Sequence, residues 1–288
     1  MNAVMDVFTL MALLGWGALV GIVFSAIGAA GGILTSFGLI TLFGVADPNS
    51  VKPMTQLVVL AAALVFVPGY LRWSCLVWPL GLLLGAGGLI GAYVGSTLSS
   101  LYLSDMHTFR PVFGLLTLGI AAQIIWKLTG PMRKGGASGV PAEQVAGCSV
   151  MRTSVTRKTL SFSYGTLNFD VPVWSPLVAG LLIAMTASIF GVGGGFLLVP
   201  YMATFLGMPM HIIPGTAAIA IFMSLVVSIS NFLALGAPLD VTILVPLAIG
   251  AVIGAIVGPR VNKALKNQWL QAGLAVIVTG IGLKYLFL

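Results

Sequence analysis

Two short glycine-rich stretches decide how this chain folds. The first is Ser25–Leu34, with the sequence SAIGAAGGIL, and the second is Ser188–Leu197, with the sequence SIFGVGGGFL. They align at an offset of 163 residues, the difference between positions 188 and 25. The same offset aligns Gly17 with Gly180, Gly44 with Gly207, and the ladder Gly87, Gly91 and Gly95 with Gly250, Gly254 and Gly258. Several matches in one order indicate an internal repeat.

The composition places this repeat in a membrane. Of the 288 residues, 59% are hydrophobic and 7% are charged, whereas soluble domains carry about 25% charged residues. Stretches without Asp, Glu, Lys or Arg run over 7–46, 73–104 and 171–239. Each of them exceeds the roughly 20 residues that a helix needs to cross a bilayer. The sequence therefore predicts an all-α polytopic membrane protein and excludes a soluble domain.

Apolar runs and the turn residues between them predict hydrophobic segments, five in each half of the chain. They span 8–28, 31–45, 53–70, 76–98, 108–127, 173–191, 193–206, 212–235, 240–259 and 268–287. Because five is odd, the second copy enters the membrane from the opposite side, so the two repeats are inverted. The segments 31–45 and 193–206 are too short, at about 1.5 Å per residue, to cross a hydrocarbon core of about 30 Å. Ten full spans and six spans with two re-entrant hairpins both fit this pattern, and the short segments favour glycine-broken or re-entrant helix pairs.

The chain divides into three regions. An N-terminal membrane repeat covers 1–127, a basic linker covers 128–172, and a C-terminal membrane repeat covers 173–288. Within the linker, Leu160–Phe169 alternates between apolar and polar residues around Gly165. That pattern is typical of a small β-hairpin.

The positions of the basic residues predict which side of the membrane each region faces. The linker carries Arg133, Lys134, Arg152, Arg157 and Lys158. By the positive-inside rule, we expect the linker to be cytoplasmic. Only Lys52, Arg110 and Lys284 then lie on the outer side. The net charge of +7 therefore reflects membrane topology and does not point to a nucleic-acid partner.

The two glycine-rich stretches are also the candidate binding site. Paired glycine-interrupted segments at matching places in inverted halves are typical of a transporter's substrate site. A glycine run lets the chain leave helical geometry, so that free backbone N–H groups and the positive end of the next helix can hold an anion. Nearby hydroxyl and amide groups can donate to the same anion. The candidates are Ser188, Gly191, Gly193, Gly194, Gly195 and Thr216 in the second copy, and Ser25, Gly28, Gly31, Gly32, Thr55 and Gln56 in the first.

Structural roles compete with this assignment. Small residues spaced by four let membrane helices pack closely, and we expect this role for the glycine ladders that begin at Gly87 and at Gly250. A serine or threonine in a membrane helix can donate to a carbonyl of its own helix, an explanation that applies to Ser25, Ser188, Thr55 and Thr216 taken singly. Gln56 has Ala217 as its counterpart, so any role that it has is asymmetric.

At these residues the chain resembles the TauE/SafE sulfite exporter family. The stretch SIFGVGGGFLLVP, which ends at Pro200, followed by Gly207 and by Pro214-Gly215-Thr216-Ala217, is similar to the family's glycine-rich signature. The resemblance extends over the whole chain, with its two hydrophobic halves and basic central linker. The first copy departs from the pattern, because Ala29 and Ala30 stand where a glycine is common and Phe37 stands where the second copy has Pro200.

The resemblance implies a secondary carrier of a sulfur oxyanion, a sulfonate or a related small organic anion, in a prokaryotic plasma or inner membrane. Its partners would be that anion and the lipid bilayer, and GxxxG-type faces are compatible with a homodimer. A passive anion channel could be built from the same inverted repeat, and an intramembrane sulfur-handling enzyme could use Cys75. The sequence predicts no catalytic residue, no metal site and no cofactor.

Overall fold

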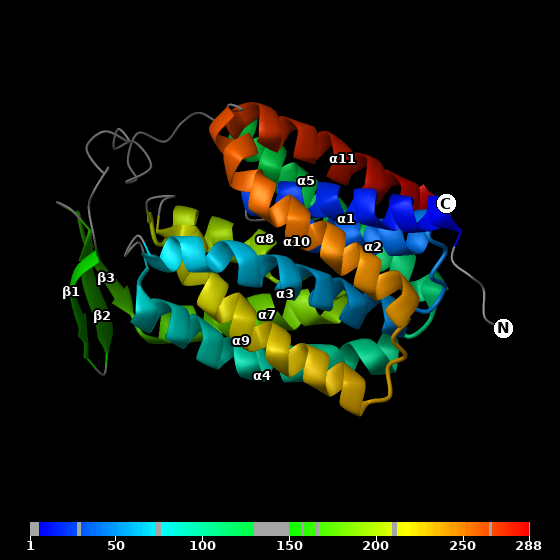
Figure 1. Ribbon diagram of the computed structural model, residues 1–288. Coiled ribbons are helices and arrows are strands. Elements are labelled where there is room, and N and C mark those ends of the chain that lie inside the picture. The colour runs from blue at the N-terminus through cyan, green and yellow to red at the C-terminus, as the bar shows by residue number, and fades with distance from the viewer. Residues whose placement is uncertain are drawn as a thin grey trace.

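The computed structural model describes residues 6–27, 30–72, 76–129, 150–156, 158–164, 167–208, 212–264 and 267–287. These residues form a long bundle of helices with a small sheet at one end (Figure 1). The two ends of the chain lie at the end of the bundle away from the sheet.

All of the predicted hydrophobic segments are helical, and each half contains the same elements in the same order. The first half contains α1 (Val7–Ile27), α2 (Gly31–Phe37), η1 (Gly38–Leu42), α3 (Pro48–Arg72), α4 (Trp78–Tyr102) and α5 (Met106–Thr129). The second half contains α7 (Trp174–Phe190), α8 (Gly195–Pro200), η3 (Tyr201–Phe205), α9 (Ile213–Ala234), α10 (Val241–Ala264) and α11 (Asn267–Phe287). In the part of the chain that the structure describes, 5 helices are long and apolar enough to cross a membrane. The protein is thus a polytopic all-α membrane protein, as predicted.

Several helices of each half pack against helices of the other half, and we call these pairs exchanged helices. Helix α1 packs against α10, and its counterpart α7 packs against α4; likewise α3 packs against α10, and its counterpart α9 packs against α4. Helix α5 packs against α11, and α3 packs against α9, so each of these pairs joins an element to its own copy. Interchanging the two halves therefore leaves these contacts unchanged, as expected for a pseudo-twofold axis.

The glycine ladders build the contacts between exchanged helices. A Cβ atom added to Gly87, Gly91 or Gly95 of α4 would overlap a backbone carbonyl oxygen of α7. These carbonyl oxygens belong to Leu177, Leu181 and Met185. In the same way, a Cβ atom added to Gly250 or Gly254 of α10 would overlap the carbonyl oxygen of Leu14 or Ala18 of α1. These partners are themselves related by the 163-residue offset. The packing role expected for the ladders is therefore confirmed.

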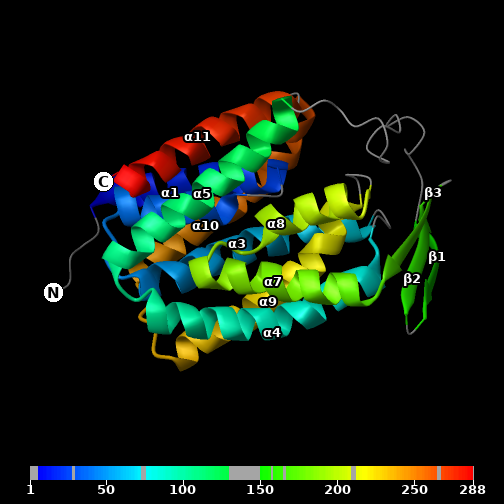
Figure 2. The ribbon, with the colours of Figure 1, turned by 180° about the vertical axis from the view of Figure 1, so that it is seen from behind.

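The halves are inverted as well as exchanged. Figures 1 and 2 show α1 running from the N-terminal end of the bundle towards the end that carries the sheet, whereas α7 starts beside the sheet and runs the opposite way. After α1, the short pair α2 and η1 turns back towards the end where α1 began. This arrangement matches the expected re-entrant helix pair.

A small antiparallel sheet precedes the second half. It consists of β1 (Val150–Val155), β2 (Thr159–Tyr164) and β3 (Leu167–Pro172), in the order β1-β2-β3. Strands β2 and β3 form a hairpin over the stretch where one was predicted, and Phe162 stacks on Phe169 across it, with ring centroids 4.9 Å apart. Residues 130–149 of the linker lie outside the described residues.

Candidate functional site

The second-copy break separates α7 from α8 by a run of left-handed backbone. Gly191, Gly193 and Gly194 have φ angles of 72°, 87° and 72°, a region that side-chain-bearing residues adopt at a cost of about 1–2 kcal/mol each. The N–H of Val192 donates to the carbonyl of Ala187 over 3.0 Å, which closes the end of α7 in a Schellman-type turn. The glycines therefore end the helix in the interior, where Gly191, Gly193, Gly194 and Gly195 are all buried.

The first-copy break lies between α1 and α2, the positions that match α7 and α8. Its left-handed residue among those described is an alanine and not a glycine. Ala30, which aligns with Gly193, has a φ of 65° and is the residue before α2. Ala30 and Gly32 are buried, as is Gly31, whose added Cβ would lie 2.7 Å from the Cβ of Phe24. Gly28, the remaining glycine candidate of this copy, lies outside the described residues.

The two breaks touch each other and helix α3. A Cβ atom added to Gly32 would overlap the carbonyl oxygen of Val192, so the first-copy break lies directly on the second. A Cβ added to Gly191 would lie 2.6 Å from the Cα of Lys52, and one added to Gly193 would lie 3.0 Å from Cγ1 of Val59. Glycine is thus required for the approach of three backbone segments. The structure brings together stretches that are 163 residues apart in the sequence.

We call the region where the two breaks meet α3, around Gly32, Gly191 and Gly193, the glycine junction. Within the described residues, some of its buried hydrogen-bonding groups have no partner. Gln56 is 1% exposed, and neither its Oε1 nor its Nε2 atom has a hydrogen-bond partner among the described residues. Gln56 lies one helical turn after Lys52 and about one turn before Val59. All three residues therefore lie on the face of α3 that contacts the second-copy break. The backbone N–H groups of Gly193 and Gly194 likewise find no acceptor within the described part of the chain. Since an unpaired buried polar group costs about 1–3 kcal/mol, the junction is suited to binding a polar ligand.

Lys52 lies beside the junction and carries a buried amino group. The side chain is 0% exposed, and its ammonium group donates to Asn49 Oδ1, Ser99 O and Leu103 O over 3.3, 3.3 and 2.7 Å. All three acceptors are neutral. The Asp47 carboxylate interacts with the Lys52 ammonium group electrostatically but is not among its hydrogen-bond acceptors. The ammonium also lies 5.3 Å from the ring centroid of Phe109.

Lys52 is the residue of this region that sequence reasoning missed. Its position near a predicted span end suggested a role in topology only, whereas the structure buries it completely. The signal in the sequence was its spacing, because Lys52 precedes Gln56 by one helical turn. Neither residue has a polar counterpart in the second half, where Ile213 and Ala217 align with them.

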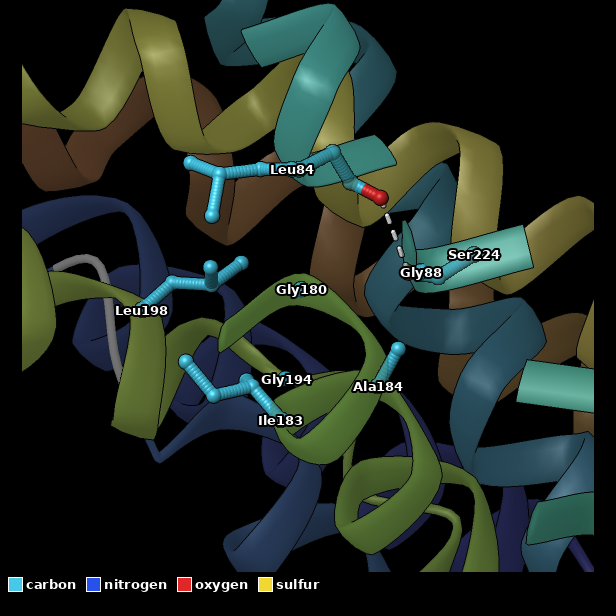
Figure 3. A pocket seen from close by; sticks show the side chains of 9 residues that line it. Leu84, Gly88, Gly180, Ile183, Ala184, Gly194, Leu198 and Ser224 are labelled. Carbon is cyan, nitrogen blue, oxygen red and sulfur yellow. Dashed lines mark hydrogen bonds between the residues drawn. The ribbon is translucent and has the colours of Figure 1, made fainter. Parts of the chain in front are cut away.

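A small cavity adjoins Gly194 between α4, α7, α8 and α9 (Figure 3). Leu84, Ile183 and Leu198 line its apolar walls, and Ser224 contributes a hydroxyl that donates to the carbonyl of Ala220 over 2.8 Å. Its volume of 10 Å³ is about that needed to hold one water molecule. In this conformation the cavity beside Gly194 therefore has no room for a larger ligand.

The remaining candidates are buried within their helices. Ser188 is buried on the last turn of α7, and Thr55 shares a 3.1 Å hydrogen bond with Ser36 of α2. The Ser25 hydroxyl donates to Gly21 O of its own helix over 2.8 Å and lies against Gly258 of α10. Thr216 donates to Ile212 O over 2.7 Å and accepts from the Val77 N–H over 3.1 Å. Thr55 thus joins the first-copy hairpin to α3, whereas Ser25 and Thr216 satisfy backbone carbonyls.

Both short helices continue into a π-helix. Phe43 N–H donates to Gly38 O over 3.0 Å and Leu206 N–H donates to Tyr201 O over 3.3 Å, bonds that skip one residue more than those of an α-helix. The two donors and the two acceptors are related by the repeat offset. Such π-turns are frequent at functional sites.

Comparisons with known proteins agree on a transporter family. Residues 13–285 match the family described as "Sulfite exporter TauE/SafE". A "Probable membrane transporter protein YunE" of Bacillus subtilis (strain 168) is 24% identical over 284 residues, which cover 94% of this chain and 95% of the relative. A "Probable membrane transporter protein" of Xylella fastidiosa (strain 9a5c) is 24% identical over 283 residues, with 96% and 95% coverage. No solved structure matches the chain significantly.

Proposed function

The chain belongs to the sulfite exporter TauE/SafE family of membrane transporters, and on this premise we propose that it is a secondary transporter of a small sulfur-containing anion. The substrate class is sulfite, a sulfonate or a related organic anion. The anion binds where the two glycine-rich breaks meet α3, near the middle of the bundle.

The observation that carries this proposal is the unpartnered amide of Gln56. Its Nε2 atom is a donor, is buried and lies on the α3 face that contacts Gly191 and Gly193. The N–H groups of Gly193 and Gly194, which have no acceptor among the described residues, lie on the facing segment, so that neutral donors come from two sides. An anion held by neutral donors gains hydrogen bonds without a direct ion pair, and a carrier must also release what it binds.

The electrostatics of the junction support an anion over a cation. In its protonated form Lys52 favours an anion over a cation nearby, since its Nζ atom donates to neutral oxygens and forms no ion pair among the described residues. The described part of the chain places no carboxylate in the junction to offer a competing site for a cation. Asp47, whose Oδ1 atom accepts from the Asn49 N–H over 2.8 Å, lies at the start of α3.

The symmetry of the fold supports alternating access as the mechanism. The cavity at Gly194 is large enough for only about one water molecule, so we propose that helices must move before the anion can enter the junction. Because the halves are inverted copies that exchange partners, each of two conformations can open the junction to a different side. Motion of one pair of exchanged helices against the other provides the change. The passive channel is disfavoured because a conducting pore needs a continuous open path.

Transport into proteoliposomes tests the proposal. Purified protein should take up labelled sulfite or a sulfonate with a saturable rate that is competed by other members of this class. Currents in a planar bilayer far above carrier turnover would instead show a channel. Anion-independent leakage, or no flux above protein-free vesicles for any sulfur anion tested, would contradict the proposed function.

The remaining assignments belong to the same proposal. The protein is placed in a prokaryotic plasma or inner membrane, with the linker and the sheet on the cytoplasmic side. The binding partners are the small anion and the bilayer. The enzyme hypothesis depends on Cys75, which lies outside the described residues; activity that survives Cys75→Ser would leave that hypothesis without support.

A further inference from the structure

A second, larger cavity lies apart from the glycine junction. Ile40 and Thr41 of η1, Arg110 of α5, and Lys284 and Tyr285 of α11 line it. Its volume of 210 Å³ compares with 10 Å³ for the cavity at Gly194. The lining elements place it at the end of the bundle away from the sheet, where the C-terminus lies (Figure 1).

Two basic side chains, Arg110 and Lys284, face this cavity. Arg110 is half-buried, and its Nε atom is buried with no hydrogen-bond partner among the described residues. Lys284 is exposed at the rim and lies 5.7 Å from the ring centroid of Phe37. Within the described part of the chain, neither cation forms an ion pair with a carboxylate. A cavity with two unpaired cations attracts an anion, and a guanidinium group fits an oxyanion through paired hydrogen bonds.

Hydroxyl groups complete the cavity. Thr41 Oγ1 and Tyr285 OH lie 2.8 Å apart in a hydrogen bond that joins η1 to α11. Tyr285 is 5% exposed and is held by Phe37 and Phe113, with ring centroids 6.1 and 5.8 Å away. The cavity wall is therefore rigid on the side of α11 and carries hydroxyls that can donate to an anion.

The cavity is connected to the glycine junction through one continuous element. Thr41 belongs to η1, which extends α2 without a break, and α2 begins directly after Ala30 at the first-copy break. The second half lacks an equivalent, because the repeat offset puts Gly273 in the place of Arg110 and Ala121 in the place of Lys284. A basic cavity thus exists at one end of an otherwise symmetric fold.

We propose that this cavity is a separate binding site for an oxyanion group, sulfate-like or phosphate-like, held by Arg110 and Lys284. Its use as a site that captures the anion on one side of the membrane rests on the proposed transport function, whereas binding itself does not. The site is asymmetric, because the matching positions of the other half carry Gly273 and Ala121 in place of Arg110 and Lys284. The oxyanion group can belong to a free anion or to the head group of an acidic lipid.

Calorimetric titration of purified protein with sodium sulfate, in uncharged detergent, tests the site. The double variant Arg110→Gln and Lys284→Gln should weaken sulfate binding at least about tenfold, which corresponds to about 1.4 kcal/mol. Lys158→Gln, which removes an exposed charge near the sheet, should leave the affinity unchanged. Arg110→Lys in an otherwise unchanged chain should restore only part of the affinity, because it keeps the charge but loses the paired hydrogen bonds.

A second experiment, with lipid, identifies whether the oxyanion group belongs to a free anion or to a lipid head group. Native mass spectrometry should show phosphatidylglycerol retained by the unmodified protein, released by sulfate and absent from the double variant if the group belongs to a lipid. Sulfate binding without lipid retention assigns the site to a free anion. Equal affinity of the double variant and the unmodified protein for both sulfate and phosphatidylglycerol would overturn the proposal. Sulfate binding that depends on Arg110 in a protein that transports no anion would contradict only the proposed function.

Discussion

Ala30 is the residue whose backbone conformation is least suited to its side chain. It is the non-glycine residue with a positive φ among those that the structure describes, and it stands where the second copy has Gly193. Its conformation is imposed by the contact of the two breaks, since α2 must turn back immediately after α1. The repeat explains why the strain is tolerated: the fold fixes this geometry in both halves, with or without a glycine.

Ala30→Gly should therefore stabilise the protein. A left-handed conformation costs a non-glycine residue about 1–2 kcal/mol, whereas glycine loses about 0.5–1 kcal/mol more than alanine in chain entropy. We expect a net gain of about 0.5–1 kcal/mol, measured as a higher midpoint of thermal unfolding in detergent. Ala248→Gly, in the middle of α10, should shift the midpoint in the opposite direction. A lower midpoint for Ala30→Gly would show that the methyl group contributes more by packing than its backbone costs.

Sequence reasoning at this scale found which residues are unusual but not what they touch. Gln56 and the glycine clusters were identified because polar residues and glycine runs are rare in apolar segments. Lys52 was missed because its burial depends on the carbonyls of Ser99 and Leu103 in another helix. Those acceptors are backbone carbonyl oxygens, which every residue has, so the sequence does not reveal which of them will accept a hydrogen bond.

At the scale of single elements, helix α4 depends on its glycine ladder. Its contact with α7 brings backbone against backbone, because an added Cβ on Gly91 would overlap the carbonyl oxygen of Leu181. The spacing of four in the sequence predicted a packing face correctly. It could not predict that the partner helix comes from the other half of the chain, since a glycine stripe carries no information about what covers it.

Gly91→Ala should destabilise the protein by about 1–3 kcal/mol, the range for overpacking a well-packed contact. The methyl group must push α4 and α7 apart, so the midpoint of thermal unfolding should fall by several degrees. Gly119→Ala in α5 is the matched control, because nothing lies within 4 Å of an added Cβ there. That control should leave the midpoint unchanged or raise it, since alanine favours helices over glycine. An unchanged midpoint for Gly91→Ala would contradict the close α4–α7 contact.

The short helices show what periodicity cannot predict. The segments 31–45 and 193–206 were expected to be partial helices from their length alone, and the structure divides each into an α-helix and a π-helix. A π-turn places one extra residue in the turn, and the sequence pattern of such short runs does not distinguish it from an α-turn. The left-handed glycines that follow, Gly44 and Gly207, mark the ends of both segments and were aligned correctly by the repeat.

For the whole molecule, the repeat predicted the architecture but not the exchange of partners. Two inverted halves follow from an odd number of segments per copy. That α1 packs on α10 and not within its own half depends on tertiary packing. The consequence is that the glycine junction contains both breaks at once, so that a change in either half alters the same site.

The proposed sidedness can be measured by labelling. In a background with Cys75→Ser and Cys148→Ser, we expect Lys158→Cys to react with a membrane-impermeant maleimide only from the cytoplasmic side. Ser104→Cys, in the exposed turn between α4 and α5, should react only from the opposite side, because α4 starts beside the sheet and ends at the other end of the bundle (Figure 1). Labelling of both positions from the same side would contradict this orientation.

The central claim is that the anion binds where the two glycine breaks meet the Gln56 amide. It is tested most directly by the initial rate of sulfur-anion uptake into proteoliposomes by Gln56→Leu. Leucine has a similar volume and removes the unpartnered polar atoms, so unfolding should occur at the same temperature or higher. The control Thr117→Val makes a similar polar-to-apolar change at a buried position of α5, where Thr117 donates to Gly114 O. The account predicts that Gln56→Leu lowers kcat/KM for uptake at least about tenfold, or about 1.4 kcal/mol, while Thr117→Val transports normally. Uptake by a folded Gln56→Leu protein at the rate of the unmodified protein would contradict it.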